Sequence, residues 1–175
     1  MNLRKATLAD RDAIYRLHWS AFPKEERAPI AQLAVDLLNT ERNPGTTSWV
    51  AERDGKIIGH VAFSPVRSVT DKSFNGSILA PVAVHPDAQK QGAARKLIEQ
   101  GVVCEKESGV DVLLVYGDPA FYGKFGFSAK QATPYVPPYD LEFRFGWQAI
   151  RFCSDRPIEE VPLTCVPSLQ NSDLW

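Results

Sequence analysis

The sequence is poor in the features that mark secreted and membrane proteins. Its only cysteines, Cys104, Cys153 and Cys165, are odd in number and show no C-x-x-C spacing. This scarcity argues against a disulfide framework and a zinc site, and it fits a reducing compartment. No run approaches about 18 apolar residues, and the start, Met1 to Lys5, lacks the apolar segment of a secretory signal. We therefore expect a cytoplasmic protein that does not cross a membrane.

An excess of charge of one sign is also missing. The chain carries 20 Lys and Arg against 21 Asp and Glu, a net charge of −1. Such a balance, without blocks of like charge, indicates neither a nucleic acid nor a membrane surface as a partner. His18 and His60 each stand alone, without a second ligand at metal-binding spacing on the same element, so no metal site is predicted. No G-x-G-x-x-G follows an early strand, which argues against a dinucleotide-binding domain.

What remains is the composition of an ordinary globular protein. Hydrophobic residues make up 44% of the chain and charged residues 23%. A chain of this length buries about 70% of the surface that its unfolded form exposes, so its core needs neither metals nor disulfides. We predict a single domain over residues 1–155, followed by a C-terminal extension or tail over 156–175 whose last eight residues are loosely held.

The predicted elements alternate in the manner of a mixed α/β fold. Strands are expected at 3–6, 49–52, 56–64, 77–84, 111–116 and 143–152, and helices around 13–22, from Pro29 to before Asn43, after Gly92, and as a short turn within 117–126. Asp54-Gly55 is typical of a tight hairpin turn. Pro81 cannot donate to a sheet ladder, so we expect the sheet to open beside it unless it only marks an edge strand.

The segment from Pro81 to Arg95 runs from a strand through a polar turn into a helix. The first N–H groups of a helix have no internal partner and carry the positive end of the helix dipole, so a turn of small residues there can wrap a phosphate. Gly92 and Ala94 are small enough to let phosphate oxygens reach the backbone N–H groups, while Gln89, Lys90 and Arg95 can add side-chain contacts to the phosphate. The turn therefore favours an anion site, with an ordinary strand-to-helix junction as the alternative.

Two segments together carry a resemblance to a known family. Gln89-x-x-Gly92-x-Ala94 resembles the Q/R-x-x-G-x-G/A signature of the GNAT superfamily of N-acetyltransferases, with alanine at the second small position. Gly117 to Phe127 resembles the other hallmark of that superfamily, an aromatic-Tyr helix that ends in Gly-Phe. The His-Pro-Asp turn and the Gly-Asp-Pro start of these segments are most similar to its YhbS-like branch. The resemblance covers residues 2 to 127 well and the remainder loosely.

The resemblance implies the GNAT acyltransferase fold, an α/β arrangement with a central, mixed but mostly antiparallel sheet that is flanked by helices and splayed between strands 4 and 5. It implies acetyl-CoA as co-substrate in that opening, without a metal. The bulge at Pro81 would free backbone groups for the pantetheine arm, and the Val82 N–H could polarise the thioester carbonyl. The implied cofactor-binding residues are Val82, Ala83, Val84, Gln89, Lys90, Gln91, Gly92, Ala93, Ala94, Arg95, Asp118 and Tyr122.

The resemblance also implies catalytic roles. Tyr122 matches the tyrosine of the family and is the candidate acid, because a phenol with a pKa of about 10 stays protonated at neutral pH and can donate to a departing thiolate. Packing beside the cofactor is its alternative role. Glu26 is the preferred base, because the loop between the first two helices borders the acceptor site in this superfamily. The other candidates for the base are Glu25, Glu52, His60, His85 and Asp118.

The predicted function is that of an N-acetyltransferase, which moves an acetyl group from acetyl-CoA to a primary amine of a small molecule or a protein by direct attack. The alternative is a non-catalytic acyl-CoA-binding sensor or interaction module. An aromatic-rich stretch over 135–147 either lines the acceptor pocket or forms core. The only partners indicated are acetyl-CoA and the amine acceptor, and the sheet edges of a small fold are compatible with a homodimer.

Overall fold

The computed structural model describes residues 1–153 and 160–175. Its strands are β1 (Asn2–Lys5), β2 (Thr47–Arg53), β3 (Lys56–Ser68), β4 (Gly76–Val84), β5 (Val112–Tyr116), β6 (Tyr135–Val136), β7 (Trp147–Arg151) and β8 (Val161–Cys165). Along the order β1-β2-β3-β4-β5-β7, neighbours are antiparallel except for the parallel pair β4–β5. β8 continues the sheet beside the far end of β3 and pairs in parallel with β6. The predicted mixed, mostly antiparallel sheet is confirmed.

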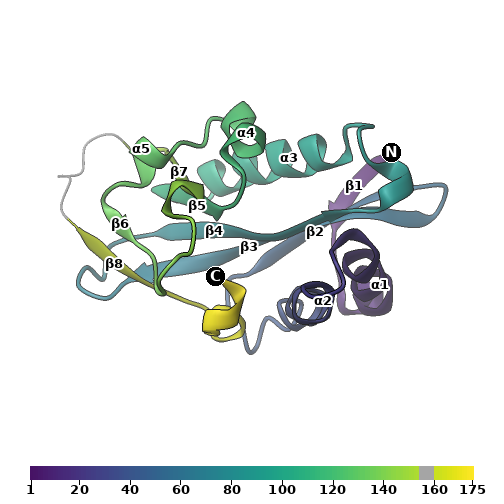
Figure 1. Ribbon diagram of the computed structural model, residues 1–175, viewed down its shortest axis with the longest axis horizontal. Helices are drawn as coiled ribbons and strands as arrows, with labels where there is room; N and C mark the ends of the chain where they lie inside the picture. Colours follow the sequence, from purple (N-terminus) through teal and green to yellow (C-terminus); the bar gives the residue numbers. More distant parts are fainter. Residues whose placement is uncertain (154–159) are drawn as a thin grey trace.

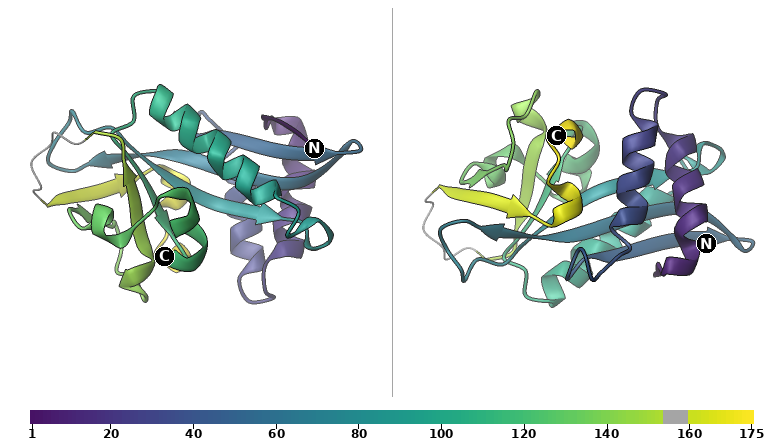
Figure 2. Two further views of the ribbon diagram at one scale, coloured as in Figure 1. Left: turned by 90° about the horizontal axis from the view of Figure 1, so that it is seen from above. Right: turned by 90° about the horizontal axis from the view of Figure 1, so that it is seen from below.

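Helices cover both faces of this sheet (Figures 1 and 2). The α-helices are α1 (Arg11–Ala21), α2 (Arg27–Asp36), α3 (Ala93–Glu107), α4 (Pro119–Tyr122) and α5 (Ala129–Ala132). The 3-10 helices are η1 (Leu8–Asp10), η2 (Pro86–Ala88), η3 (Gly123–Phe125), η4 (Arg144–Gly146), η5 (Pro167–Leu169) and η6 (Ser172–Leu174). α1 and α2 lie on one face together with the C-terminal 3-10 turns, and α3, α4 and α5 lie on the other (Figure 1). None of the described helices has the length and apolarity needed to span a bilayer.

The predicted hairpin is confirmed, while several element ends differ from expectation. Asp54 and Gly55 join β2 to β3 with φ of 51° and 72°, the left-handed backbone that two-residue hairpins favour. β3 runs on to Ser68 because β8 gives its last residues a partner. α2 begins at Arg27 and ends at Asp36, well before Asn43. The strand expected over 143–152 begins only at Trp147, because the Gly146 N–H bonds the Phe143 carbonyl and closes a turn there.

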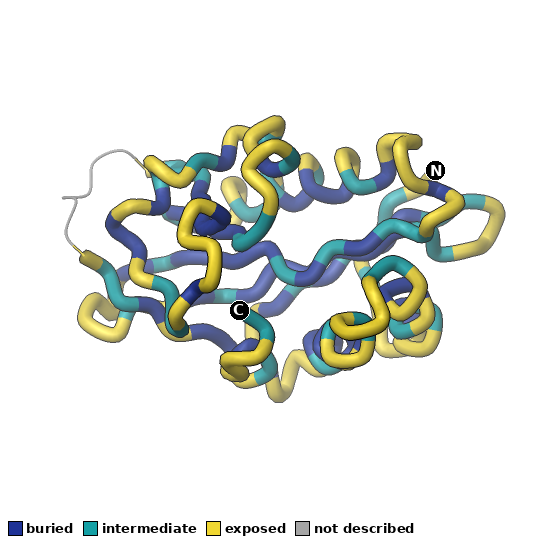
Figure 3. The backbone as a smooth tube through the Cα atoms, in the orientation of Figure 1, coloured by how far each residue is buried: buried dark blue, intermediate teal, exposed yellow. Residues whose placement is uncertain are grey.

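The face of the sheet beneath α3 is tightly packed. The helix buries Leu97 and Ile98 completely, and Figure 3 shows this burial following its sheet-facing side. Gly101 lies directly over Phe63 of β3, where an added Cβ would come within 1.9 Å of the ring. Since Phe63 is itself only 1% exposed, glycine at 101 is what allows the helix to approach the sheet so closely. This close packing fixes the position of the first turn of α3.

The C-terminal segment is packed rather than loosely held. β8 pairs Cys165 with Val66, and the following 3-10 turns bring Leu169 to 2% exposure. The Trp175 indole N–H donates to the Leu169 carbonyl at 3.0 Å. The expectation of a loose tail over the last eight residues was wrong, because their apolar side chains fill the face beside α2, a contact that local pattern does not reveal. The predicted boundary at 155/156 lies outside the described residues, and that division stays a prediction.

An ion-pair cluster joins β1 to the residue before α1 and makes the stability of the fold depend on pH in the acid range. Both terminal guanidinium nitrogens of Arg4 donate to the Asp10 carboxylate at 2.8 Å, and Arg4 also pairs with Glu52 at 2.6 Å. The hydrogen bond from Arg4 is the main reason that the pKa of Asp10 falls from 3.8 to about 2. A lowered folded-state pKa contributes stability that is present above pH 4 and is lost as the pH falls towards 2.

We therefore expect urea denaturation to show a loss of stability between pH 4 and 2 that is smaller in Asp10→Asn. Asp12→Asn, at an exposed position of α1, is the control and should retain the acid sensitivity of the unmodified protein. Equal acid sensitivity in both variants would contradict this role of Asp10.

Candidate functional site

The sheet opens between β4 and β5. These strands pair only from Gly76–Val112 to Leu79–Val115. β4 then places two residues between Leu79 and Val82 where β3 places one, so a bulge lies at Ala80-Pro81. Beyond it, β4 follows β3 alone, which leaves the β5-facing backbone of its last residues without a ladder partner. The predicted splay beside Pro81 is confirmed.

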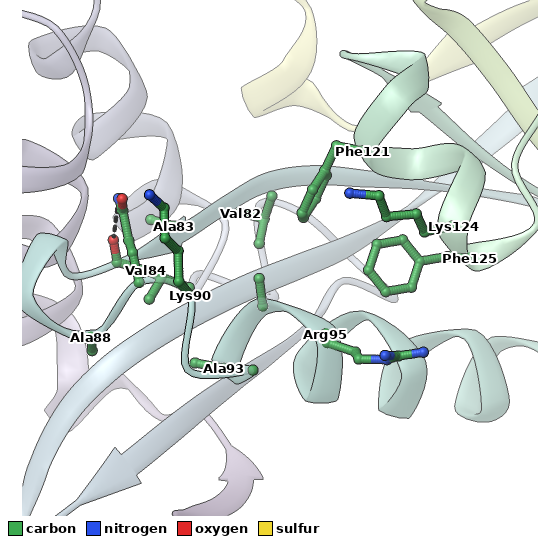
Figure 4. Close-up of a pocket in the computed structure, with 13 residues that line it drawn as sticks. Val82, Ala83, Val84, Ala88, Lys90, Ala93, Arg95, Phe121, Lys124 and Phe125 are labelled. Carbon is green, nitrogen blue, oxygen red and sulfur yellow. Dashed lines mark hydrogen bonds between the residues drawn. The ribbon is translucent and has the colours of Figure 1, made fainter.

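A cleft of about 780 Å³ occupies this opening on the α3 side of the sheet. One wall is the end of β4, the floor is the turn into α3, and the other wall comes from α4 and η3 (Figure 4). Its lining residues are Val82, Ala83, Val84, Ala88, Gln89, Lys90, Gly92, Ala93, Ala94, Arg95, Phe121, Lys124 and Phe125. The volume falls in the range of cavities of about 300–1,000 Å³ that bind small molecules and cofactors.

The charge of this cleft suits an anion. Lys90, Arg95 and Lys124 line it, and no carboxylate occurs among its described lining residues. Gly92 is the N-cap of α3 and supplies no side-chain cap, so the first N–H groups of the helix stay available. The positive end of the helix dipole adds to these cations. Arg95 is partly neutralised by Glu99 at 2.8 Å, whereas Lys124 points from η3 into the cleft (Figure 4).

The backbone of the turn explains its residue types. Gly92 has a φ of +83°, a conformation that a residue with a Cβ adopts only with strain, and Lys90 also lies at positive φ, 60°. The side-chain amide nitrogen of Gln89 donates a hydrogen bond to the Val84 carbonyl at 3.4 Å. Gln91 instead faces away, because its amide oxygen accepts from Arg53 at 2.6 Å and its amide nitrogen donates to Asp87. The turn is thus held from outside while its inner side stays open.

Tyr122 stands at the edge of the opening and is firmly positioned. Its ring packs edge-on against Phe121 and Phe127, with centroid separations of 5.0 and 5.9 Å, and Gly117 has no Cβ that would collide with it. Burial raises the pKa of Tyr122 to about 12. No hydrogen bond joins its hydroxyl to another of the described residues. The phenol is therefore protonated near neutral pH and free to donate to a ligand.

A second cavity, of about 190 Å³, lies on the other face of the opening. It shares the lining residue Val82 with the cleft, so the two spaces approach each other beside the point where β4 parts from β5, and Tyr122 lines the second cavity. Its walls come from the C-cap residue of α1, from α2, the β4 bulge, the end of β5 and the C-terminal 3-10 turns. The lining residues are Phe22, Ile30, Leu33, Ile78, Leu79, Ala80, Pro81, Val82, Tyr116, Tyr122, Leu169, Leu174 and Trp175.

Nine of the twelve residues predicted to bind cofactor line the cleft, and three do not. Gln91 faces away from it, and Tyr122 opens into the second cavity. Asp118 caps α4, where its carboxylate accepts the Ala120 N–H at 2.8 Å. The structure adds Ala88 to the lining, and it adds Lys124 and two phenylalanines from the segment around Tyr122. The last three residues lie close to Tyr122 in the sequence. Nothing in the pattern Gly123-Lys124-Phe125-Gly126, however, indicates that the lysine side chain would face β4.

The residues considered for the base lie apart from both cavities. Glu26 is the exposed N-cap of α2, and Glu25 is exposed beside it. Glu52 pairs with Arg4, and His85 accepts the Asp87 N–H at 3.3 Å. None of these four lines the cleft or the second cavity as far as the described residues show. The choice of base, Glu26 included, stays a prediction.

His18 and His60, which stand alone in the sequence, meet in the fold. His18 Nε2 lies 2.9 Å from His60 Nδ1 between α1 and the sheet, and both side chains are fully buried. Burial lowers the pKa of His18 to about 3 and that of His60 well below its usual range. Both rings are neutral near pH 7. Among the described residues, no three His, Cys, Asp or Glu side chains are grouped to hold a metal ion.

This combination of fold and site defines a class of protein. A sheet that opens between its parallel strands, beside a glycine turn that begins a helix, is the architecture of the GNAT acyltransferases. The chain matches the family model described as an acetyltransferase (GNAT) domain over residues 2–129. It belongs to the GNAT acetyltransferase family.

Individual relatives agree with this assignment. The N-acetyltransferase YhbS of Escherichia coli K12, itself uncharacterised, is 41% identical over 83 residues, which cover 47% of this chain and 49% of YhbS. The chain thus spans about half the length of the curated relatives that it matches first. The crystal structure of E. coli YhbS in complex with CoA has a TM-score of 0.81 at 26% identity, over 97% of this chain and 92% of that one.

A second solved structure is similar over the whole fold. A GNAT family acetyltransferase from Brucella melitensis, in complex with acetyl-CoA, has a TM-score of 0.76 at 25% identity and covers 97% of both chains. The resemblance to the YhbS-like branch is confirmed.

Proposed function

We propose that the protein transfers an acetyl group from acetyl-CoA to a primary amine. The observation that carries this proposal is that two cavities, on opposite faces of the sheet, share the lining residue Val82 beside the opening between β4 and β5. One cavity is long and cationic, as a nucleotide-bearing thioester requires, and the other approaches the same point from the opposite face. Two reactants bound in these cavities would approach each other at Val82 without sharing a binding site.

Acetyl-CoA would lie along the cleft. Its pyrophosphate would rest on the turn from Gln89 to Ala94, and Lys124 would face the phosphates from the other wall. The pantetheine arm would bond to the backbone of Val82 and to the Val84 N–H, since the Val84 carbonyl already accepts from Gln89. The relatives with bound CoA and acetyl-CoA, which are similar over nearly the whole chain, support this placement.

The proposed reaction is a direct attack of the amine on the acetyl thioester. The amine nitrogen bonds to the acetyl carbon, the carbon–sulfur bond breaks, and CoA leaves as a thiolate. The amine loses one proton to become a neutral amide, and the thiolate gains one. A free N–H at Val82 would stabilise the developing oxyanion. Glu26, our proposed base, would act through water, because its side chain is exposed and lines neither cavity.

Tyr122 would assist the departure of sulfur by donating a hydrogen bond. A phenol with a pKa of about 12 does not fully protonate a thiolate whose conjugate acid has a pKa of about 8.5, but it stabilises the negative sulfur in a dry site. We expect Tyr122→Phe to lower kcat by about 100-fold while the KM for acetyl-CoA changes little. Steady-state kinetics would measure both constants.

The matched control for Tyr122→Phe is Tyr139→Phe, which removes a hydroxyl that lines neither the cleft nor the second cavity. It should leave both constants unchanged. A kcat for Tyr122→Phe within twofold of the unmodified protein would leave Tyr122 with a packing role alone.

The test of the proposed function is turnover with a panel of primary amines. Release of the CoA thiol should depend on both amine and protein, and mass spectrometry should find one added acetyl group on the amine. The alternative is an acyl-CoA-binding sensor or interaction module. Tight binding of acetyl-CoA without turnover of any amine would favour this alternative.

A further inference from the structure

The second cavity is apolar in a way that constrains what enters it. Its described lining contains no charged side chain, although α1 and α2 carry charged residues on their outer sides. An ammonium group placed there would lose its hydration without a carboxylate side chain in this described lining to replace it, which is costly. A second cationic group on the same molecule, as in a diamine, would meet the same penalty. The cavity therefore disfavours polyamines and lysine-like side chains.

The size of the second cavity further limits which amines it can bind. A volume of 190 Å³ is far below that of a site for a drug-sized ligand. Engineered apolar cavities of about 150 Å³ in another protein bind benzene. The second cavity thus accommodates a group of about one aromatic ring, with a short linker.

Few side chains in the described lining carry a hydroxyl group. Tyr116 and Tyr122 are the two lining residues that carry a hydroxyl, whereas Phe22, Ile30 and Trp175 belong to the apolar part of the wall. The Tyr116 oxygen accepts the Phe143 N–H at 3.1 Å and keeps its own hydrogen for another partner. An amine oriented with its nitrogen at Val82 and Tyr122 and its apolar group against α2 and Trp175 would present that nitrogen to the thioester.

We propose that the acceptor is a small primary amine carrying one apolar, ring-sized group, of the phenethylamine class, which this cavity binds. The proposal rests on the proposed acetyl transfer and adds the chemical class of its acceptor. The C-terminal turns, through Leu174 and Trp175, supply part of the wall that selects it.

The first experiment compares phenethylamine with ethanolamine, a hydrophilic primary amine of the same chain length. Burial of the ring should raise kcat/KM for phenethylamine by about 30-fold or more. Cadaverine, which carries a second cationic amine, should be the poorest of the three. Equal values for phenethylamine and ethanolamine would overturn the proposal.

A charged substitution in the wall of the second cavity tests whether the amine binds there. Ile30 is partly exposed in α2 and lines the cavity, so Ile30→Asp should fold and place a carboxylate there. The preference for phenethylamine over cadaverine should fall by about 30-fold or more, because the ring loses an apolar wall and the second ammonium gains a partner. Ala28→Asp, at an exposed position of the same helix, should leave the preference unchanged.

A binding measurement separates this proposal from the proposed function. N-(2-phenylethyl)acetamide, the expected product, should bind by calorimetry to the unmodified protein and to Ala28→Asp, and at least tenfold more weakly to Ile30→Asp. If no amine is acetylated but this pattern holds, acetyl transfer fails and the apolar site stands. Hexanoyl-CoA used in preference to acetyl-CoA, without discrimination among amines, would instead assign the cavity to the acyl chain and overturn the proposal.

Discussion

Glutamate in place of Gly92 is expected to abolish acetyl-CoA binding, with a rise in Kd of at least about 100-fold. Gly92 lines the cleft as the N-cap of α3, with no atom within 4 Å of the position that a Cβ would occupy. A glutamate there would extend into the space proposed for the pyrophosphate. Its carboxylate would repel the phosphates and take up the helix N–H groups that should hold them. Calorimetric titration with acetyl-CoA would measure the change.

The control for Gly92→Glu must separate backbone strain from blockage of the cleft. Gly109 has a φ of +81° and, like Gly92, no neighbour within 4 Å of an added Cβ. It follows α3 instead of beginning it and lies outside the cleft. Gly109→Glu should therefore bear the same conformational strain and bind acetyl-CoA normally. Normal binding by Gly92→Glu would remove the turn from the cofactor site.

Alanine in place of Gly101 is expected to destabilise the fold by about 3 kcal/mol. The added Cβ would lie 1.9 Å from Cζ and 2.2 Å from Cε2 of Phe63. Phe63 is 1% exposed and has no free space into which to turn, so α3 must move away from the sheet. Since α3 begins at the cofactor turn, acetyl-CoA binding should also weaken. Urea denaturation would measure the stability.

Two further variants test the origin of that loss. Gly123→Ala adds a Cβ where no atom lies within 4 Å, at a φ of −56°, and should change stability by less than about 0.5 kcal/mol. Phe63→Leu combined with Gly101→Ala should recover part of the stability lost in Gly101→Ala alone. An unchanged stability in Gly101→Ala would show that α3 is not held against the sheet by this contact.

Local backbone chemistry accounts for the parts of the molecule that the sequence predicts well. Asp54-Gly55 and Pro81 each constrain a few φ angles or remove a hydrogen-bond donor, and the hairpin and the bulge appear where these residues stand. Gly92 similarly marks the left-handed residue before α3. Such features depend on adjacent residues, so a single sequence contains what is needed to predict them.

Contacts between distant segments account for what the sequence did not predict. His18 and His60 are 42 positions apart, and no local pattern indicates that α1 brings one ring onto the other. Lys124 faces the cleft only because α4 and η3 stand opposite β4. Leu169 and Trp175 look like residues of a polar tail until the face beside α2 provides them with neighbours. Each of these arrangements is decided by tertiary packing.

The cleft and the second cavity are lined by different parts of the chain, and this has a consequence for how such proteins diversify. The family model ends at residue 129, after every residue that lines the cleft, whereas part of the wall of the second cavity comes from η5 and η6, some forty residues later. Mutations in that late segment would alter what the second cavity admits without disturbing the phosphate turn. If the second cavity is the acceptor site that we propose, the C-terminal turns are where evolution, or library-based engineering, would exchange one acceptor for another.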